Sequence, residues 1–267
     1  MSISDYYGEH VIAFIDILGF ADLVQRMDKS PSLIDSVYEV LSRVHKEEIS
    51  EQFGDWIREG LANLTLASDS IFLSIGIDAW SRSGTHRDVA WACLATLESI
   101  FWLQRYLLKR GVLTRGGVAF GSLLHHDNVI FGPALVRAYR LESQLALFPR
   151  AIIDAPVLNY VATAEPSTHF EFPSRLNSLT RRDVDGLVYV DYLHFNAMSV
   201  ENEPRMAALF GEVRQNIVVA LEAARSDVRI FQKVAWLANY FNASLCRLIS
   251  EGISGVSSVE QIEVATL

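Results

Sequence analysis

The sequence predicts an α+β protein, and three observations lead to this prediction. Strand-like and helix-like patterns alternate along residues 11–154 in the order β-α-α-β-β-α-β-β-α-β. The middle of this order contains the split βαβ pattern of ferredoxin-like βαββαβ domains. The chain has 267 residues, 50% of them hydrophobic, which suffices to bury one large core between an antiparallel-containing sheet and helices on one of its faces.

Strands are expected where short apolar or alternating runs end at glycine, proline or small polar residues. They are expected at residues 11–18, 61–67, 70–75, 113–120, 128–131, 151–154 and 187–192. Ser68 and Asp69 join the second and third of these runs. This spacing predicts a hairpin with an acid at its tip.

Helices are expected where apolar residues recur at three- and four-residue spacing. They are expected at residues 20–53 in two segments, the second from Pro31, and at 88–110, 133–147, 202–224 and 227–250. Gly111 follows one helix as a C-terminal cap, and Gly132-Pro133 opens the next. The alternation of these helices with the strands completes the α+β prediction.

The pattern loosens after residue 154. A polar segment covers residues 163–185 before the last strand and the two last helices. We therefore expect residues 1–154 to form the core and residues 155–267 to extend the same domain with a strand and two helices, or to help it dimerise. Residues 252–267 are expected to be frayed.

Charge and composition narrow the class of partner. The formal net charge is −9, from 23 basic and 32 acidic residues, which disfavours nucleic acid or an anionic membrane as the main partner. The N-terminus lacks a signal-peptide pattern, and no uncharged apolar run is long enough for a spanning helix. Cys93 and Cys246 lack metal-type spacing and do not indicate a disulfide framework. We expect a cytoplasmic protein.

Two acids, Asp16 and Asp69, lie in apolar strand-like settings. A buried acid is costly unless a cation meets it. Magnesium and manganese take oxygen ligands, and one or two carboxylates together with water and substrate phosphates hold them. The pair therefore suggests a divalent metal site. An alternative stays open, in which Asp16 caps a helix that starts near Gly19 and Asp69 fills a turn.

Other residues could bind an anion. The loop from Gly19 leads into a helix, whose N-terminal NH groups can bind phosphate, although a plain tight turn also explains one glycine. Arg115 is followed by two glycines and could bring its planar fork close to a phosphate. Arg140 lies on a predicted helix, where a solvated or paired arginine is more common.

Two further motifs favour structural roles. In His125-His126-Asp127 neighbouring side chains point in different directions, so a metal site is not favoured. Residues 236–242 have the spacing of a core helix rather than of a nucleotide-binding segment.

Four motifs in this order resemble those of class III nucleotide cyclases. They are Phe14-Ile15-Asp16-Ile17-Leu18-Gly19-Phe20, Ser68-Asp69-Ser70, Arg115-Gly116-Gly117-Val118-Ala119-Phe120-Gly121, and Gly132 with Ala138-Tyr139-Arg140-Leu141-Glu142. The short form and the segment at residues 148–154 are most similar to the bacterial pyrimidine cyclases of the Pycsar antiphage systems. The resemblance implies a class III cyclase catalytic core at residues 1–154, and a phosphorus-oxygen lyase.

The resemblance also implies roles for single residues. Asp16 and Asp69 would bind two divalent cations, Mn²⁺ or Mg²⁺, with the backbone of Ile17 as a further ligand. The turn at Phe20 and Ala21 would hold the terminal phosphates of a nucleoside triphosphate.

Two arginines take roles from the same resemblance. Arg115 would bind phosphate, and Arg140 would steady charge on the transferring phosphoryl group. The family works as a head-to-tail homodimer with active sites at the interface, so Arg140 would serve the metal acids of the other chain.

The sequence departs from the family at three positions. Val136 stands where the family has an asparagine four residues before the arginine. Thr65 and Val129 stand where adenylyl cyclases have a purine-selecting lysine and acid. A purine pocket of the usual kind is therefore not expected, and Asn63 and Thr65 are candidates for reading another base.

These implications lead to one functional expectation with alternatives. UTP would be converted to 3′,5′-cyclic UMP and pyrophosphate by two-metal catalysis, giving a second messenger for antiphage defence that a separate effector senses. The alternatives are a cytidylate cyclase that makes cyclic CMP, a purine (adenylate or guanylate) cyclase, and a catalytically silent nucleotide-binding dimer.

Overall fold

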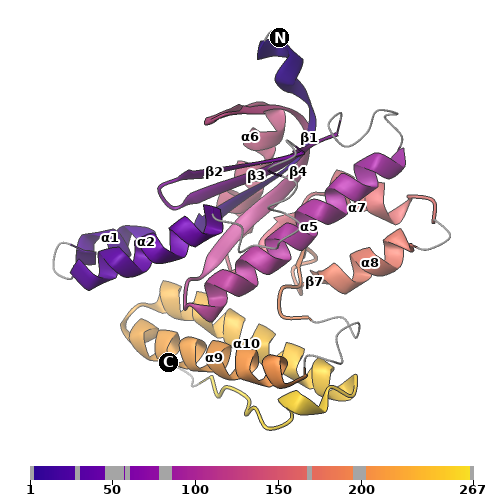
Figure 1. The fold of residues 1–267 in the computed structure, drawn as a ribbon. Coiled ribbons are helices and arrows are strands. Elements are labelled where there is room, and N and C mark those ends of the chain that lie inside the picture. Colours follow the sequence, from indigo (N-terminus) through magenta and orange to yellow (C-terminus); the bar gives the residue numbers. More distant parts are fainter. Residues whose placement is uncertain are drawn as a thin grey trace.

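A computed structural model describes residues 3–27, 31–45, 57, 61–77, 86–166, 170–194 and 203–264 (Figure 1). The strands are β1 (Tyr7–Ile17), β2 (Ala62–Ala67), β3 (Ser70–Gly76), β4 (Thr114–His126), β5 (Val129–Phe131), β6 (Ala151–Ile153), β7 (Thr180–Arg182) and β8 (Val188–Val190). The helices are α1 (Phe20–Met27), α2 (Pro31–His45), α5 (His86–Lys109), α6 (Pro133–Arg140), α7 (Ala155–Ala162), α8 (Phe172–Leu179), α9 (Glu203–Ala223) and α10 (Val228–Ser250). The part of the first helical prediction beyond α2, up to residue 53, lies outside the described residues.

The strands form one sheet in the order β2-β3-β1-β4-β6-β8-β7, with β5 paired to β4. Each of the first four strands in this order is antiparallel to its neighbours. Strand β3 therefore lies between β1 and β2, and β1 lies between β3 and β4, which is the split βαβ arrangement. Strand β6 adds parallel to β4, and β8 and β7 follow antiparallel. The α+β prediction is confirmed.

Helices cover both faces of the sheet near β1, which corrects the expectation that they lie on one face. Val11 and Ile15 of β1 belong to the main core, which includes α5, whereas Phe14 packs on the other face against Ala134 and Ala138 of α6. Figure 1 shows α5 in front of the sheet and α6 behind it. The reason is visible in β1, which is buried at successive positions, as in strands covered on both faces.

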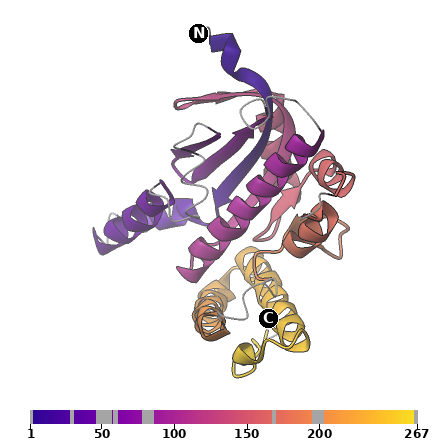
Figure 2. The ribbon, with the colours of Figure 1, turned by 45° about the vertical axis from the view of Figure 1, so that its right-hand side comes forward.

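The region after residue 154 contains more structure than its pattern predicts. Helix α8 occupies part of the polar segment, because Phe172, Leu176 and Leu179 have helical spacing and are buried. Strands β7 and β8 continue the sheet of the core. Helices α9 and α10 lie side by side next to one end of α5 (Figures 1 and 2).

The C-terminal segment is packed rather than frayed, up to residue 264. Ile253, Val256 and Ile262 are buried. The side-chain amide of Asn242 in α10 donates to the carbonyl oxygen of Ile262 and accepts from its backbone NH, both at 2.8 Å. This pairing and the apolar contacts correct the expectation. Residues 265–267 lie outside the described part of the chain.

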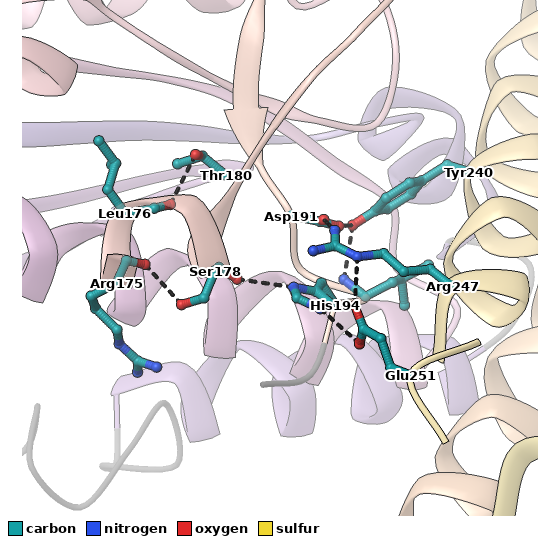
Figure 3. A network of polar contacts seen from close by, with 10 residues as sticks. Arg175, Leu176, Ser178, Thr180, Asp191, His194, Tyr240, Arg247 and Glu251 are labelled. Carbon is teal, nitrogen blue, oxygen red and sulfur yellow. Dashed lines mark hydrogen bonds and ion pairs between the residues drawn. The ribbon is translucent and has the colours of Figure 1, made fainter. Parts of the chain in front are cut away.

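A polar network joins α10 to the segment after β8 (Figure 3). The hydroxyl of Tyr240 donates to Asp191 at 2.6 Å and accepts from the backbone NH of Leu193 at 2.8 Å. Arg247 bonds both Asp191 and Glu251. Because Asp191 is buried, these partners stabilise its carboxylate and fix α10 to the sheet.

The segment at residues 148–154 contains a structural anchor. Arg150 is 1% exposed and pairs with Asp183 and Asp185, which lie between β7 and β8. Its guanidinium also lies over the rings of Tyr189 and Trp236. Burial of an arginine is tolerated because these acids and rings surround it.

Helix α10 is part of the core, as its spacing predicts: Leu237, Ala238 and Phe241 are buried. Cys93 and Cys246 are free thiols, the first buried and the second exposed. None of the described helices is long and apolar enough to cross a membrane.

Candidate active site

Strand pairing places Asp16 and Arg115 on one face of the sheet. Asp16 lies opposite Arg115 of β4 and opposite Ser70 of β3. Residues directly opposite each other in antiparallel strands point to the same side. Phe14, two residues before Asp16, packs against α6 and so identifies this face as the one that α6 covers.

The β2–β3 hairpin brings Asp69 to Asp16. The backbone NH of Ile17 donates to the carbonyl oxygen of Asp69 at 3.0 Å, which ties the hairpin tip to β1. Ser68 has a φ of 59°, the left-handed conformation that tight two-residue hairpin turns require. The hairpin therefore holds the second predicted acid beside the first.

The two aspartates interact directly. Burial raises the pKa of Asp16, the hydrogen bond and charge of Arg115 lower it, and the charge and a hydrogen bond of Asp69 raise it again, with a net upward shift. A carboxyl whose pKa is raised by a second acid lies close to that acid. The structure thus brings together the pair that the sequence singled out.

Arg115 lies between two acids. Its Nε donates to Oδ2 of Asp16 at 3.3 Å and lies 2.7 Å from Oε1 of Glu142. Within the described residues, neither of its Nη amino groups makes a hydrogen bond. Arg115 is therefore held through Nε, and its two amino groups remain available to an anion.

Glu142 is a member of this cluster that sequence reasoning did not assign to the site. It lies in the π-helical segment Leu141–Leu145, directly after α6, and is 2% exposed. Burial raises its pKa, Arg115 lowers it, and the charges of Asp16 and Asp69 raise it further, with a net upward shift. The only sequence signal was its place at the end of the fourth motif.

The donor set fits a divalent cation of the magnesium type. Asp16, Asp69 and Glu142 place up to three carboxylates around a single positively charged side chain, that of Arg115. All three acids offer oxygen ligands. Among the described residues, no group of three or more His, Cys, Asp or Glu forms a complete metal site. Two aspartates are enough where water and substrate phosphates supply the remaining ligands. Asp16 and Asp69 would hold the ion, beside the backbone of Ile17.

The turn after β1 has a structural reason for its glycine. Gly19 has a φ of 77°, which favours glycine, and its carbonyl oxygen accepts from the NH of Leu23 at 3.0 Å. Helix α1 begins at Phe20, so the NH groups of Phe20 and Ala21 belong to its unpaired first turn. The turn explains Gly19, and the phosphate role of Phe20 and Ala21 stays a prediction.

Arg140 lies away from partners among the described residues of its own chain. It is exposed in the last turn of α6, and its side chain makes no hydrogen bond or ion pair with the described residues. Val136, one turn earlier, is 49% exposed. Six large apolar side chains are exposed along this rim: Val129, Phe131, Val136, Tyr139, Leu145 and Leu147. The role of Arg140 toward another chain stays a prediction.

The candidate base-reading residues lie on the same sheet face as Asp16. Thr65 is opposite Phe72, which is opposite Phe14, and Asn63 is opposite Ser74. Thr65 is buried, and its Oγ1 lies 2.9 Å from Nε2 of His125. Asn63 is partly buried.

His125 is a buried structural residue. Its Nδ1 lies 2.8 Å from the hydroxyl of Ser74, so hydroxyls meet both ring nitrogens. Burial, and to a lesser extent the charge of His10, lower the pKa of His125 to about 4. The ring is therefore neutral near pH 7, and both of its nitrogens are paired with hydroxyl groups.

Gly117 allows the close approach of α6 that positions Glu142. A Cβ on Gly117 would lie 2.6 Å from Cβ of Leu141 and closer still to the carbonyl oxygen of Ala138. The glycines after Arg115 were expected to give its side chain access to phosphate. The structure assigns Gly117 instead to packing between β4 and the helix.

Gly117→Ala should therefore be destabilising. We expect a loss of about 1–3 kcal/mol in unfolding free energy from overpacking, measured by urea denaturation. Gly211→Ala in α9 is the matched control, because a Cβ there meets nothing within 4 Å and alanine favours a helix by about 1 kcal/mol. Equal stability changes in the two variants would contradict the packing role of Gly117.

Comparisons with known proteins give only remote likenesses. No protein-family model matches the chain, and no curated protein matches it. The adenylyl cyclase CyaB from P. aeruginosa is 18% identical, covers 69% of this chain and 93% of its own, and has a TM-score of 0.41. A bacterial light-regulated adenylyl cyclase is 18% identical over 79% and 98% of the two chains, with a TM-score of 0.38. The guanylyl cyclase Cya2 is 12% identical over 69% and 91%, with a TM-score of 0.40.

Proposed function

We propose that the protein is a class III pyrimidine nucleotide cyclase that converts UTP to 3′,5′-cyclic UMP and pyrophosphate. One observation carries the proposal: Asp69 of the hairpin turn lies beside Asp16, next to Arg115, whose two Nη groups make no hydrogen bond with the described residues. A carboxylate pair beside a cationic fork suits a substrate that brings a divalent cation and phosphates together. The four motifs, in the order of this family, support the same reaction class.

In the proposed reaction the 3′-hydroxyl of the ribose attacks the α-phosphorus. The new O–P bond forms as the bond from the α-phosphorus to the bridging oxygen breaks, and pyrophosphate leaves while the hydroxyl proton passes to solvent. Bound divalent cations would lower the pKa of the hydroxyl and neutralise the leaving group.

The protein groups contribute by position and charge. Asp16 and Asp69 hold the cations, Arg115 binds a phosphate through its amino groups, and the first turn of α1 at Phe20 and Ala21 offers NH groups to the terminal phosphates. A homodimer would supply Arg140 of the second chain to the transferring phosphoryl group. The exposed apolar rim along α6 and β5 is suited to such a contact.

The choice of a pyrimidine follows from the two departures at the purine-reading positions. Thr65 has a short side chain whose hydroxyl bonds His125, and Val129 has an exposed apolar side chain. Neither residue supplies the charged group with which adenylyl cyclases of this family select a purine. Asn63 and Thr65 remain the candidates for contact with the smaller base. By the same resemblance, the product would be a second messenger for antiphage defence, sensed by a separate effector.

The test is a product assay with all four ribonucleoside triphosphates. The full chain is incubated with UTP, CTP, ATP or GTP and Mn²⁺, and products are identified by chromatography and mass spectrometry. We expect cyclic UMP from UTP and at least tenfold less product from the others. Cyclic CMP as the main product would make CTP the substrate in place of UTP. A purine cyclic nucleotide as the main product would overturn the pyrimidine assignment. Nucleotide binding without any cyclic product would leave the silent dimer as the function.

A further inference from the structure

We propose that Glu142 is a positioning residue that receives the Nε–H of Arg115 when Asp16 binds a divalent cation. Arg115 would then remain in the site with both amino groups directed to the anionic substrate. The inference rests on the proposed function, because it assigns a role within the same site.

The geometry around Nε carries the first step. The Nε of an arginine has a single hydrogen, and two carboxylates compete for it here. The hydrogen bond goes to Oδ2 of Asp16 at 3.3 Å, although Oε1 of Glu142 is nearer, at 2.7 Å. A small rotation of the guanidinium would transfer the N–H from Asp16 to Glu142 without moving the Arg115 backbone.

Glu142 has a buried carboxylate oxygen that lacks a hydrogen-bond donor among the described residues. This oxygen is the fully buried Oε1. A buried carboxylate oxygen without a donor costs free energy, so native structures rarely leave one unpaired. The Nε–H of Arg115 is close enough to be this donor, but its hydrogen bond goes to Asp16.

A bound cation and Arg115 would compete for the carboxylate of Asp16. A carboxylate that ligates a cation has less charge to offer Arg115, and like charges repel the guanidinium from the ion. Without Glu142, Arg115 would either compete with the cation for Asp16 or leave the site. Glu142 resolves this competition because it binds Arg115 a short distance from Asp16.

The test measures Mn²⁺ binding alone, by electron paramagnetic resonance of the free ion titrated against the full chain. Glu142→Asp keeps the charge but shortens the side chain, so it retains the direct attraction for the cation and loses the contact with Nε. We expect its Mn²⁺ affinity to fall about threefold to tenfold, since Arg115 then stays on Asp16. The same substitution in an Arg115→Met background should have no effect on the affinity, because no N–H remains to be transferred.

Glu98→Asp is the matched control, since Glu98 pairs with Nε of Arg175 at 2.6 Å, on elements outside the cluster. It should leave the Mn²⁺ affinity unchanged. Thermal unfolding without metal would show whether each variant is folded.

The outcomes separate the two proposals. An unchanged affinity in Glu142→Asp, or an equal loss in the Arg115→Met background, would overturn the role of Glu142 while the metal site stands. Absence of Mn²⁺ binding by the unmodified chain would overturn both this role and the metal assignment of the proposed function.

Discussion

Asp16→Asn should abolish cyclic nucleotide formation and leave the folded protein at least as stable as the unmodified chain without metal. The variant keeps the size of the side chain and removes its charge. We expect product formation to fall at least ~1,000-fold, because the carboxylate pair that holds the cations is lost. Retention of substantial activity would remove Asp16 from the metal site.

The stability half of this prediction follows from the raised pKa of Asp16. A carboxyl with a higher pKa in the folded state than in the unfolded state binds its proton more tightly when folded. Its contribution to stability is complete below the unfolded pKa, near 4, and is lost as the pH rises through the folded pKa. Near pH 7 the ionised carboxylate of Asp16 therefore lowers the free energy of unfolding, and the neutral amide of Asp16→Asn removes this cost.

The measurement is thermal unfolding in a metal chelator from pH 4 to pH 8, alongside the product assay. The Tm advantage of Asp16→Asn should grow with pH over this range, and added Mn²⁺ should raise the Tm of the unmodified chain but not that of Asp16→Asn. Asp127→Asn is the matched control, because Asp127 is exposed in the β4–β5 turn with a φ of 52° that asparagine accepts. A large fall in the Tm of Asp16→Asn would mean that lost activity reports unfolding.

The sequence was most informative where a local pattern decides the structure. Asp16 follows a continuous apolar run, and Asp69 sits between two strand-like runs, so the register of an antiparallel hairpin is enough to bring them together. The strand order of the core likewise follows from the alternation of elements.

The features that were missed depend on contacts between distant segments. Glu142 reaches Arg115 only because a π-helical turn follows α6 and because Gly117 lets that helix approach β4. Packing of the C-terminal segment depends on the pairing of Asn242 with Ile262. None of these contacts has a local signal, since each is set by how two elements approach in the folded chain.

We expect Arg140 to serve the active site of a second chain. Arg140 is exposed with no partner among the described residues of its own chain, whereas the acids near Asp16 already have Arg115. If each active site combines the aspartates of one chain with Arg140 of the other, Asp16→Asn and Arg140→Met damage different halves of the site. Each variant alone should retain below ~1% of the activity.

Co-expression of the two variants should restore activity. A mixed head-to-tail dimer has one site that carries both substitutions and one that carries neither. With random pairing, half of the dimers are mixed, so the mixture should reach about a quarter of the unmodified activity. The check is product formation by the whole co-expressed mixture, and mixed dimers isolated through two different tags should reach about half of the unmodified activity. Co-expressed Asp16→Asn and Asp69→Asn are the control, since these substitutions affect the same half and should not complement. A mixture as inactive as its components would place Arg140 in the site of its own chain or outside it, because only a site shared between chains can be rebuilt by exchange of subunits.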